Sequence, residues 1–178
     1  VMVMRLTSDS KKGKLSRIIS LESLHTDKTI TADGHTITMT GYPTPVSGDK
    51  RIGDAWKNGL KYAQQLVVKN KGGKISVVDG TKLKVEDADE IIVLMSAATN
   101  YVQCMDDSYN YFSQEDPLEK VQATLHKVAD KKYTALLATH QKDYHSLYDR
   151  MRLNLGNLPE APVAPTDSLL KGMDENTN

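Results

Sequence analysis

One short stretch carries side chains that could do chemistry, namely His140, Asp143, Tyr144 and His145. On a helix, His140 and Tyr144 share one face because they are four residues apart, and Asp143 lies three residues from His140. A His-x-x-Asp pair could begin a metal site, but alone it is a weak signal. Half-buried, hydrogen-bonded packing of His140 and Tyr144 against a β-sheet explains the same residues better. We therefore predict no metal site here.

Four carboxylates fall in one loop, at Asp106, Asp107, Glu115 and Asp116. A glycosidase needs two carboxyl groups roughly 5 to 10 Å apart, one of them with a raised pKa. Nothing in the surrounding sequence indicates such an environment, and the glycine-containing ligand pattern of a calcium loop is absent. We interpret these residues as solvated loop acids and predict no catalytic residue among them.

Aromatic side chains gather in two long loops, residues 41–59 and 99–116. The candidates for ligand binding or for a domain interface are Trp56, Tyr101, Tyr109 and Tyr111, and Phe112 accompanies them. Aromatic rings on such loops can stack on sugars or pack against another domain. Packing against a neighbouring domain is the favoured use.

Composition and missing motifs exclude several function classes. The 178 residues carry 23 basic and 23 acidic side chains, so no net charge attracts nucleic acid or an anionic membrane. The apolar run at residues 91–95 is too short for a membrane helix, which needs roughly 20 residues. A single cysteine, Cys104, excludes an internal disulfide and a cysteine zinc cluster. Neither a Gly-x-Ser-x-Gly elbow nor a phosphate-binding glycine loop occurs, and no cofactor is expected.

The first hundred residues predict a series of strands that would position these loops. Dipeptides that favour tight turns occur at Asp33-Gly34, Gly72-Gly73 and Asp79-Gly80. In strand 60–69, alternation places Leu66 and Val68 on one face and Gln65 on the other. About eight strands are expected, at residues 1–6, 15–24, 28–32, 35–40, 60–69, 75–78, 82–86 and 89–101. This pattern is typical of an antiparallel β-sandwich.

The remainder predicts helices. Asp116 suits the N-cap of a first helix, with Pro117 in its first turn and Glu119 three residues after the cap. A second helix is expected at residues 133–152. Its apolar stripe comprises Leu136, Leu137, His140, Tyr144, Leu147, Tyr148 and Met151.

The predicted organisation has four parts. They are part of a β-sandwich domain (1–101), a loop (102–116), linker helices (117–156), and a proline-containing linker with the start of a further helix (157–178). Because the chain opens on a strand-like run without an initiator methionine, we expect a fragment of a larger domain.

Three stretches in this order resemble one family. They are residues 88–101 (ADEIIVLMSAATNY), residues 133–150 with His140, Tyr144 and Arg150, and residues 153–169 with Leu153-Asn154-Leu155-Gly156. Together they are similar to the N-terminal β-domain and helical linker of glycoside hydrolase family 95, the α-L-fucosidase family. The opening residues 1–8 are similar to a strand midway through that β-domain. The resemblance covers most of the chain, is diffuse at residues 41–59, and meets a longer loop at residues 104–115.

The resemblance implies a mainly β fold with C-terminal helices, a partial, supersandwich-like antiparallel β-sandwich followed by a two- to three-helix linker. In the parent protein it implies a catalytic helical barrel and inverting hydrolysis of terminal α-L-fucosides, or α-L-galactosides in some members. The family's catalytic residues lie in and after the barrel, so none transfers to this chain, which alone should not be an active enzyme. The implied partners are the barrel and the carbohydrate substrate, without nucleic acid or membrane. A bacterial glycan-degrading parent would be periplasmic or extracellular.

A free-standing carbohydrate-binding sandwich module is the alternative, with Trp56 and Tyr109 or Tyr111 on the sugar. The paired amphipathic helices at residues 117–152 favour the enzyme part, because a free module has no need of their apolar stripes. In that case Trp56 and loop 99–116 should face the barrel or the substrate entrance.

Overall fold

The computed structural model describes residues 1–8, 14–43, 59–102 and 112–153. The chain divides into two compact units, Val1–Thr139 and His140–Asn178. The strands are β1 (Met2–Thr7), β2 (Leu15–Ile19), β3 (Lys28–Asp33), β4 (Thr36–Gly41), β5 (Tyr62–Lys71), β6 (Lys74–Val78), β7 (Lys82–Ala88) and β8 (Glu90–Thr99), and the helices are α2 (Pro117–His126) and α3 (Tyr133–Tyr148). None of the helices in the described part is long and apolar enough to cross a membrane.

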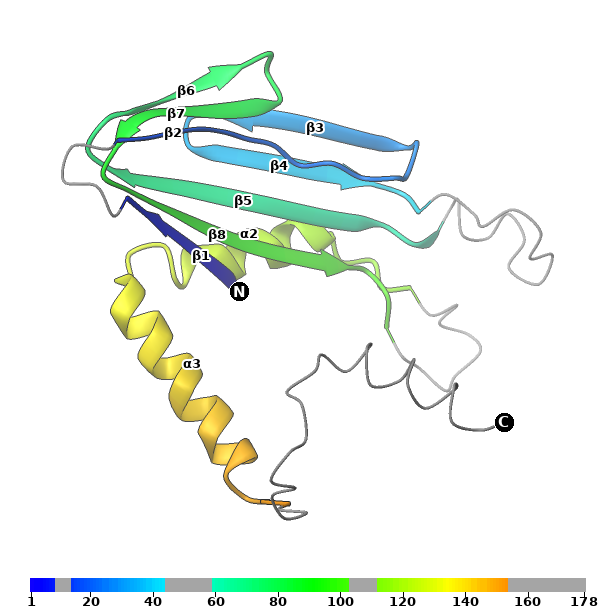
Figure 1. The fold of residues 1–178 in the computed structure, drawn as a ribbon. Coiled ribbons are helices and arrows are strands. Elements are labelled where there is room, and N and C mark those ends of the chain that lie inside the picture. Colours follow the sequence, from blue (N-terminus) through cyan, green and yellow to red (C-terminus); the bar gives the residue numbers. More distant parts are fainter. Residues whose placement is uncertain (9–13, 44–58, 103–111, 154–178) are drawn as a thin grey trace, which may run out of the picture. The chain divides into compact units, whose positions relative to one another are not determined.

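The strands form two antiparallel sheets. The larger has the order β1-β8-β5-β4-β3, and the smaller has the order β2-β7-β6 (Figure 1). Their facing sides share one core, to which β4 and β5 contribute Ile37, Leu66 and Val68, and β7 contributes Leu83 and Val85. The predicted class, an antiparallel β-sandwich followed by helices, is confirmed.

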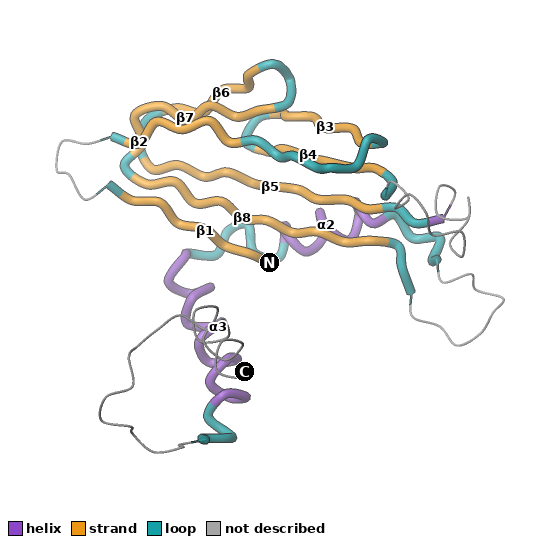
Figure 2. The backbone as a smooth tube through the Cα atoms, turned by 45° about the vertical axis from the view of Figure 1, so that its right-hand side comes forward, coloured by secondary structure: helices purple, strands orange, loops and turns teal. Residues whose placement is uncertain are grey.

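Helix α2 covers the other face of the large sheet, so β5 and β8 are buried on both sides (Figure 2). Val121 and Leu125 of α2 pack with Ala63 of β5 and Leu94 of β8, all at most 2% exposed. The Asp116 carboxylate caps the helix as predicted, since it accepts a hydrogen bond from the Leu118 N–H at 2.9 Å.

Gln65 shows that both faces of β5 are covered. The sequence placed it on the face opposite Leu66 and Val68, and that face is also buried because it carries α2, so Gln65 is only 8% exposed. Its amide Nε2 donates to Thr38 Oγ1 at 2.8 Å, which satisfies the buried donor. Alternation of apolar and polar residues does not predict which side chains are exposed where both faces of a strand are covered.

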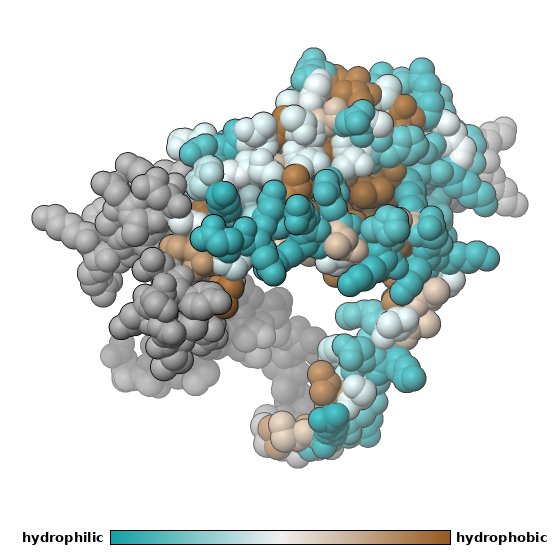
Figure 3. Space-filling view, turned by 180° about the vertical axis from the view of Figure 1, so that it is seen from behind, coloured by the Kyte–Doolittle hydropathy of each residue, from teal (hydrophilic) through white to brown (hydrophobic). Residues whose placement is uncertain are grey.

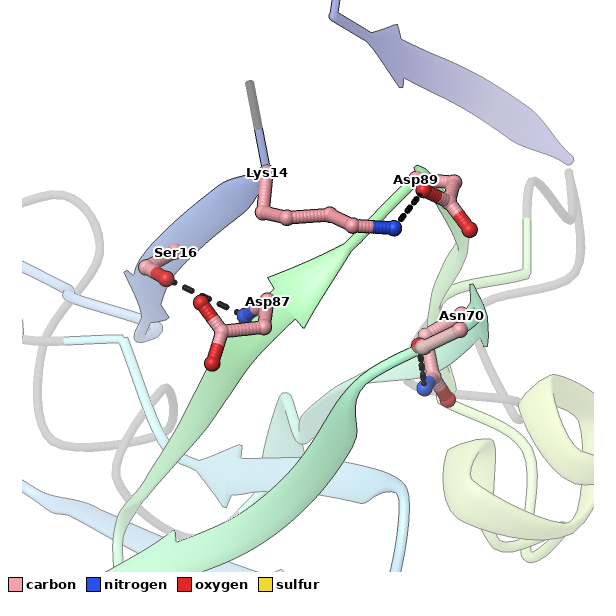
Figure 4. Close-up of polar contacts among 6 residues, drawn as sticks. Lys14, Ser16, Asn70, Asp87 and Asp89 are labelled. Atoms are coloured by element: carbon pink, nitrogen blue, oxygen red, sulfur yellow. Dashed lines mark hydrogen bonds and ion pairs between the residues drawn. The ribbon is translucent and has the colours of Figure 1, made fainter. Parts of the chain in front are cut away.

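The chain crosses from β5 to β6 and back from β7 to β8 at one corner of the sandwich, which we call the sheet corner (Figure 4). Gly72 and Gly73 turn β5 into β6, and both have positive φ. Asp87, with φ 56°, bends the end of β7, and its N–H donates to Ser16 Oγ at 3.1 Å. Asp89 then joins the crossings, because its N–H donates to the Lys71 carbonyl at 2.7 Å and its carboxylate pairs with Lys14.

Two local expectations need correction. Asp33 pairs with Thr36, so Gly34 and His35 form the centre of that hairpin, one residue later than predicted. Only Gly34 of this pair has positive φ, at 54°. Strand β2 ends at Ile19 instead of continuing to residue 24. At Asp79-Gly80 both residues have positive φ, as the predicted turn requires.

Gly73→Ala tests the sheet corner against a matched glycine. Gly73 and Gly80 have nearly equal φ, 65° and 64°, but an added Cβ at Gly73 would collide with the Glu86 carbonyl oxygen, whereas Gly80 has open space. We expect Gly80→Ala to lower the free energy of unfolding by about 1 kcal/mol, the cost of the backbone conformation. Gly73→Ala should lower it by at least about 2 kcal/mol more, measured by chemical denaturation. Equal losses would contradict the described corner.

Candidate functional site

The two long loops that carry the predicted aromatic residues begin and end where strands β4, β5 and β8 of the large sheet terminate. Gly41, the last residue of β4, pairs with Tyr62, the first residue of β5. Tyr62 in turn pairs with Thr99, the last residue of β8. Antiparallel pairing therefore brings together the ends of both loops, at the end of the strands opposite the sheet corner (Figure 1). We call this end of the sheet the loop end.

Asn100 joins the chain segments at the loop end. It is 4% exposed and lies between residues that flank the two loops. Towards β5, its N–H donates to the Lys61 carbonyl at 3.2 Å, and its side-chain Oδ1 accepts from the Lys61 N–H at 2.7 Å. Towards the helices, its carbonyl accepts from the Ser113 N–H at 2.8 Å, and Nδ2 donates to the carbonyls of Ser113 at 3.3 Å and Gly59 at 2.7 Å.

Gly59 and Phe112 close the same junction through an apolar contact. Phe112 forms an isolated antiparallel bridge with Tyr101. Its ring lies directly against Gly59, so that a side chain at position 59 would overlap ring carbons. The ends of the two loops are therefore held by both hydrogen bonds and close packing.

The structure places one of the four predicted aromatic candidates. Tyr101 stands at the loop end, is 49% exposed, and its N–H donates to Thr99 Oγ1 at 3.3 Å. Trp56, Tyr109 and Tyr111 lie outside the described residues. Sequence reasoning missed the role of Asn100, although a polar amide directly after a buried strand was a usable signal.

A second group at the loop end, on the sandwich side of β5, was also missed. The Tyr62 ring lies 5.5 Å from the His25 ring, centroid to centroid, and the Tyr62 hydroxyl lies 3.4 Å from Ser23 Oγ. Lys28 Nζ donates to the carbonyls of Ser23 and His25, both at 2.9 Å, and so fixes the segment after β2. These contacts position polar and aromatic groups at the loop end.

The acidic residues have structural partners. Glu115 forms an ion pair with Lys120 at 2.6 Å, and Asp116 caps α2. Asp106 and Asp107 lie outside the described residues. On β7, hydrogen bonds from Lys84 and Lys74 lower the pKa of Glu86 below its ordinary value, which suits an ion pair and is opposite to what a general acid requires.

The residues of α3 from His140 onward are exposed. His140 and Tyr144 were expected to be half-buried, but both are exposed, Tyr144 by 50%, together with Leu147 and Tyr148. Figure 3 shows hydrophobic and hydrophilic atoms side by side on this helix. The Tyr144 and Tyr148 rings stack at 5.1 Å.

A hollow of about 450 Å³ lies against the face formed by His140, Asp143, Tyr144, Leu147 and Tyr148. His145 pairs with Asp149, at 3.2 Å, instead of joining that face. Within the described ranges no group of three or more His, Cys, Asp or Glu residues could hold a metal ion.

A double substitution tests the packing at the loop end. We expect Gly59→Ala to lower the free energy of unfolding by about 1 to 3 kcal/mol, because the new methyl group overlaps the Phe112 ring. In a Phe112→Ala background the same change should cost less than about 0.5 kcal/mol, since the overlapping ring is gone. Thermal or chemical denaturation of the four proteins gives the coupling energy, and simple additivity would contradict the contact.

Comparisons with known proteins agree with this architecture. Residues 1–104 match the sequence model described as glycosyl hydrolase family 65, N-terminal domain. The chain is 25% identical over 181 residues to probable alpha-fucosidase A of Aspergillus niger, which covers 98% of this chain and 21% of that protein. It is 32% identical over 160 residues to alpha-L-fucosidase 2 of Arabidopsis thaliana, which covers 82% of this chain and 18% of that protein.

The chain therefore spans about a fifth of the length of these curated relatives. The expected glycoside hydrolase N-terminal domain is confirmed, whereas the match does not single out family 95. By the match over its first 104 residues, this chain belongs to the family of glycosyl hydrolase family 65 N-terminal domains.

Proposed function

We propose that this chain is the N-terminal accessory part of an α-L-fucosidase-like glycoside hydrolase and that catalysis takes place elsewhere in the parent protein. The observation that carries the proposal is the 32% identity to alpha-L-fucosidase 2 over 82% of the chain. In this proposal the parent belongs to family 95 and hydrolyses terminal α-L-fucosides with inversion. The order of the three family-95-like stretches supports this finer assignment.

An accessory role fits the chemistry of the described residues. A glycosidase needs two facing carboxyl groups, one of them with a raised pKa. The carboxylate of Glu115 instead forms an ion pair with Lys120, and that of Asp116 accepts a hydrogen bond from an N–H at the start of α2. The chain therefore contributes shape and contacts, and the catalytic carboxylates come from the barrel.

Two surfaces are proposed to meet the rest of the parent. The first is the loop end, where Tyr101 is half-exposed beside the buried Asn100. The second is the stripe on α3, where Leu147 and Tyr148 are 59% and 62% exposed. Exposed apolar side chains at helical spacing are typical of a surface that another element covers. We propose that the catalytic barrel covers this stripe.

Activity measurements test the division of labour. The full-length parent should release fucose from an oligosaccharide with a terminal α-L-fucosyl group, with β-L-fucose as the first product seen by NMR, because inversion changes the anomeric configuration. The 178-residue chain alone should release none. Hydrolysis by the chain alone would overturn the accessory role.

Two further outcomes decide between narrower claims. Activity of the parent on a different glycoside, and not on fucosides, would reject the substrate and leave the family assignment in place. Glycan binding by the isolated chain that is lost on Trp56→Ala would favour a free carbohydrate-binding module.

Substitutions on α3 test the proposed covering of its stripe. Leu147→Asp places a charge on the stripe, and Ala138→Asp places the same charge on the opposite side of the helix, nine residues away at 100° per residue. Both positions are exposed in this chain. In the isolated chain, both variants should therefore keep a free energy of unfolding within about 0.5 kcal/mol of the unsubstituted chain.

In the full-length protein, Leu147→Asp should lower the melting temperature by several degrees, because the charge would be buried against the barrel. Ala138→Asp should not have this effect. If the two variants behave alike in the full-length protein, the stripe is not an interface.

A further inference from the structure

Asn100 makes an unusual double connection, in which its side chain acts as additional main chain. Its own N–H and its Oδ1 together complete a reciprocal pair of hydrogen bonds with Lys61. Its own carbonyl and its Nδ2 complete a second reciprocal pair with Ser113. One residue thereby acts as a strand with partners on both sides at a point where the regular ladder of β5 and β8 has ended.

We infer that Asn100 is the positioning residue of the loop end, which sets the main chain at Gly59 and Lys61 against the main chain at Ser113. The inference deepens, and rests on, the proposal that the loop end faces the catalytic part of the parent. The partners of Asn100 are distant in sequence, 41 residues for Gly59 and 13 for Ser113. The amide thus fixes the ends of both long loops relative to each other.

Only a short primary amide supplies this set of contacts. The Lys61 N–H requires an acceptor, whereas the Gly59 and Ser113 carbonyls require two donors. An aspartate at this position has acceptors alone and would face two carbonyl oxygens. A glutamine has the correct groups, but its longer side chain does not fit a site that is 4% exposed. These requirements determine which end of the Asn100 amide carries the oxygen.

Burial gives the junction its rigidity. Water does not compete for the hydrogen bonds of a buried amide, so loss of the two donors leaves the carbonyls unpaired in a dry site. Misplacement of a contacting element by about 1 Å costs an enzyme on the order of 100-fold in rate. A change at Asn100 should therefore affect catalysis in the parent although Asn100 does not touch the reacting atoms.

Asn70 provides a matched control at the sheet corner. Its Nδ2 also donates to a main-chain carbonyl, that of Gly72 at 2.6 Å. This hydrogen bond spans only two residues, and it lies at the opposite end of β5 (Figure 4). Asn70→Asp removes the same kind of donor without affecting the loop end.

The experiment compares N100D and N70D in the full-length protein, with wild type beside them. Hydrolysis of a terminal α-L-fucoside gives kcat/KM, and hydrogen exchange gives the protection of the Lys61 and Ser113 amides. We expect N100D to lower kcat/KM about tenfold or more. It should reduce the protection of the Ser113 amide, because the carboxylate faces the Ser113 carbonyl, whereas the Lys61 amide keeps an acceptor in the aspartate. N70D should keep kcat/KM within about twofold and leave both amides protected. Asn100→Ser, which is neutral and smaller, should shift both readouts in the same direction if N100D does not fold.

Each outcome decides the inference. Equal kcat/KM in N100D and N70D would show that Asn100 has no positioning role in the reaction, even if exchange increases. Unchanged protection of the Ser113 amide in N100D would overturn the structural basis itself. A wild-type protein that does not hydrolyse the fucoside would reject the proposed function, and hydrogen exchange would then still decide whether Asn100 joins the two segments.

Discussion

The antiparallel pairing of β5 with β8 is the interaction on which the rest of the structure depends. The two strands pair over ten residues, from Tyr62 with Thr99 to Lys71 with Glu90. One face packs on the small sheet and the other packs under α2, so both hydrophobic clusters require this pair. The two ends of this strand pair differ. At one end the chain turns from one sheet to the other, and at the other end the long loops begin and end.

The sequence predicted most of this architecture from local signals, because turns and strand patterns are short-range properties. Gly72-Gly73 and Asp79-Gly80 turn where expected, and Asp116 caps α2. The features that the sequence did not indicate depend on tertiary contacts. Gln65 is buried because a helix from later in the chain covers it. The hairpin at Gly34 is shifted by one residue because pairing of the flanking strands sets its centre.

The candidate site was harder to predict for the same reason. Aromatic composition singled out two loops, and Tyr101, near the start of the second, lies at the loop end. The contribution of Asn100 depends on Lys61 and Ser113, which only the folded topology brings beside it. The stripe on α3 was recognised from its spacing, but its exposure in this chain could not be, because periodicity identifies an apolar face without identifying what covers it.

The pairing of β5 with β8 also determines the order in which its contacts can form. The pair of Lys71 with Glu90, at the sheet corner, closes a loop over residues 72–89. The pair of Tyr62 with Thr99 closes a longer loop, because it encloses both strands as well. Closing a shorter loop costs less conformational entropy, so the ladder should form first at the corner and extend towards Asn100. The junction that holds the two long loops would then be the last part of this sheet to order during folding and the first to open when the ladder frays.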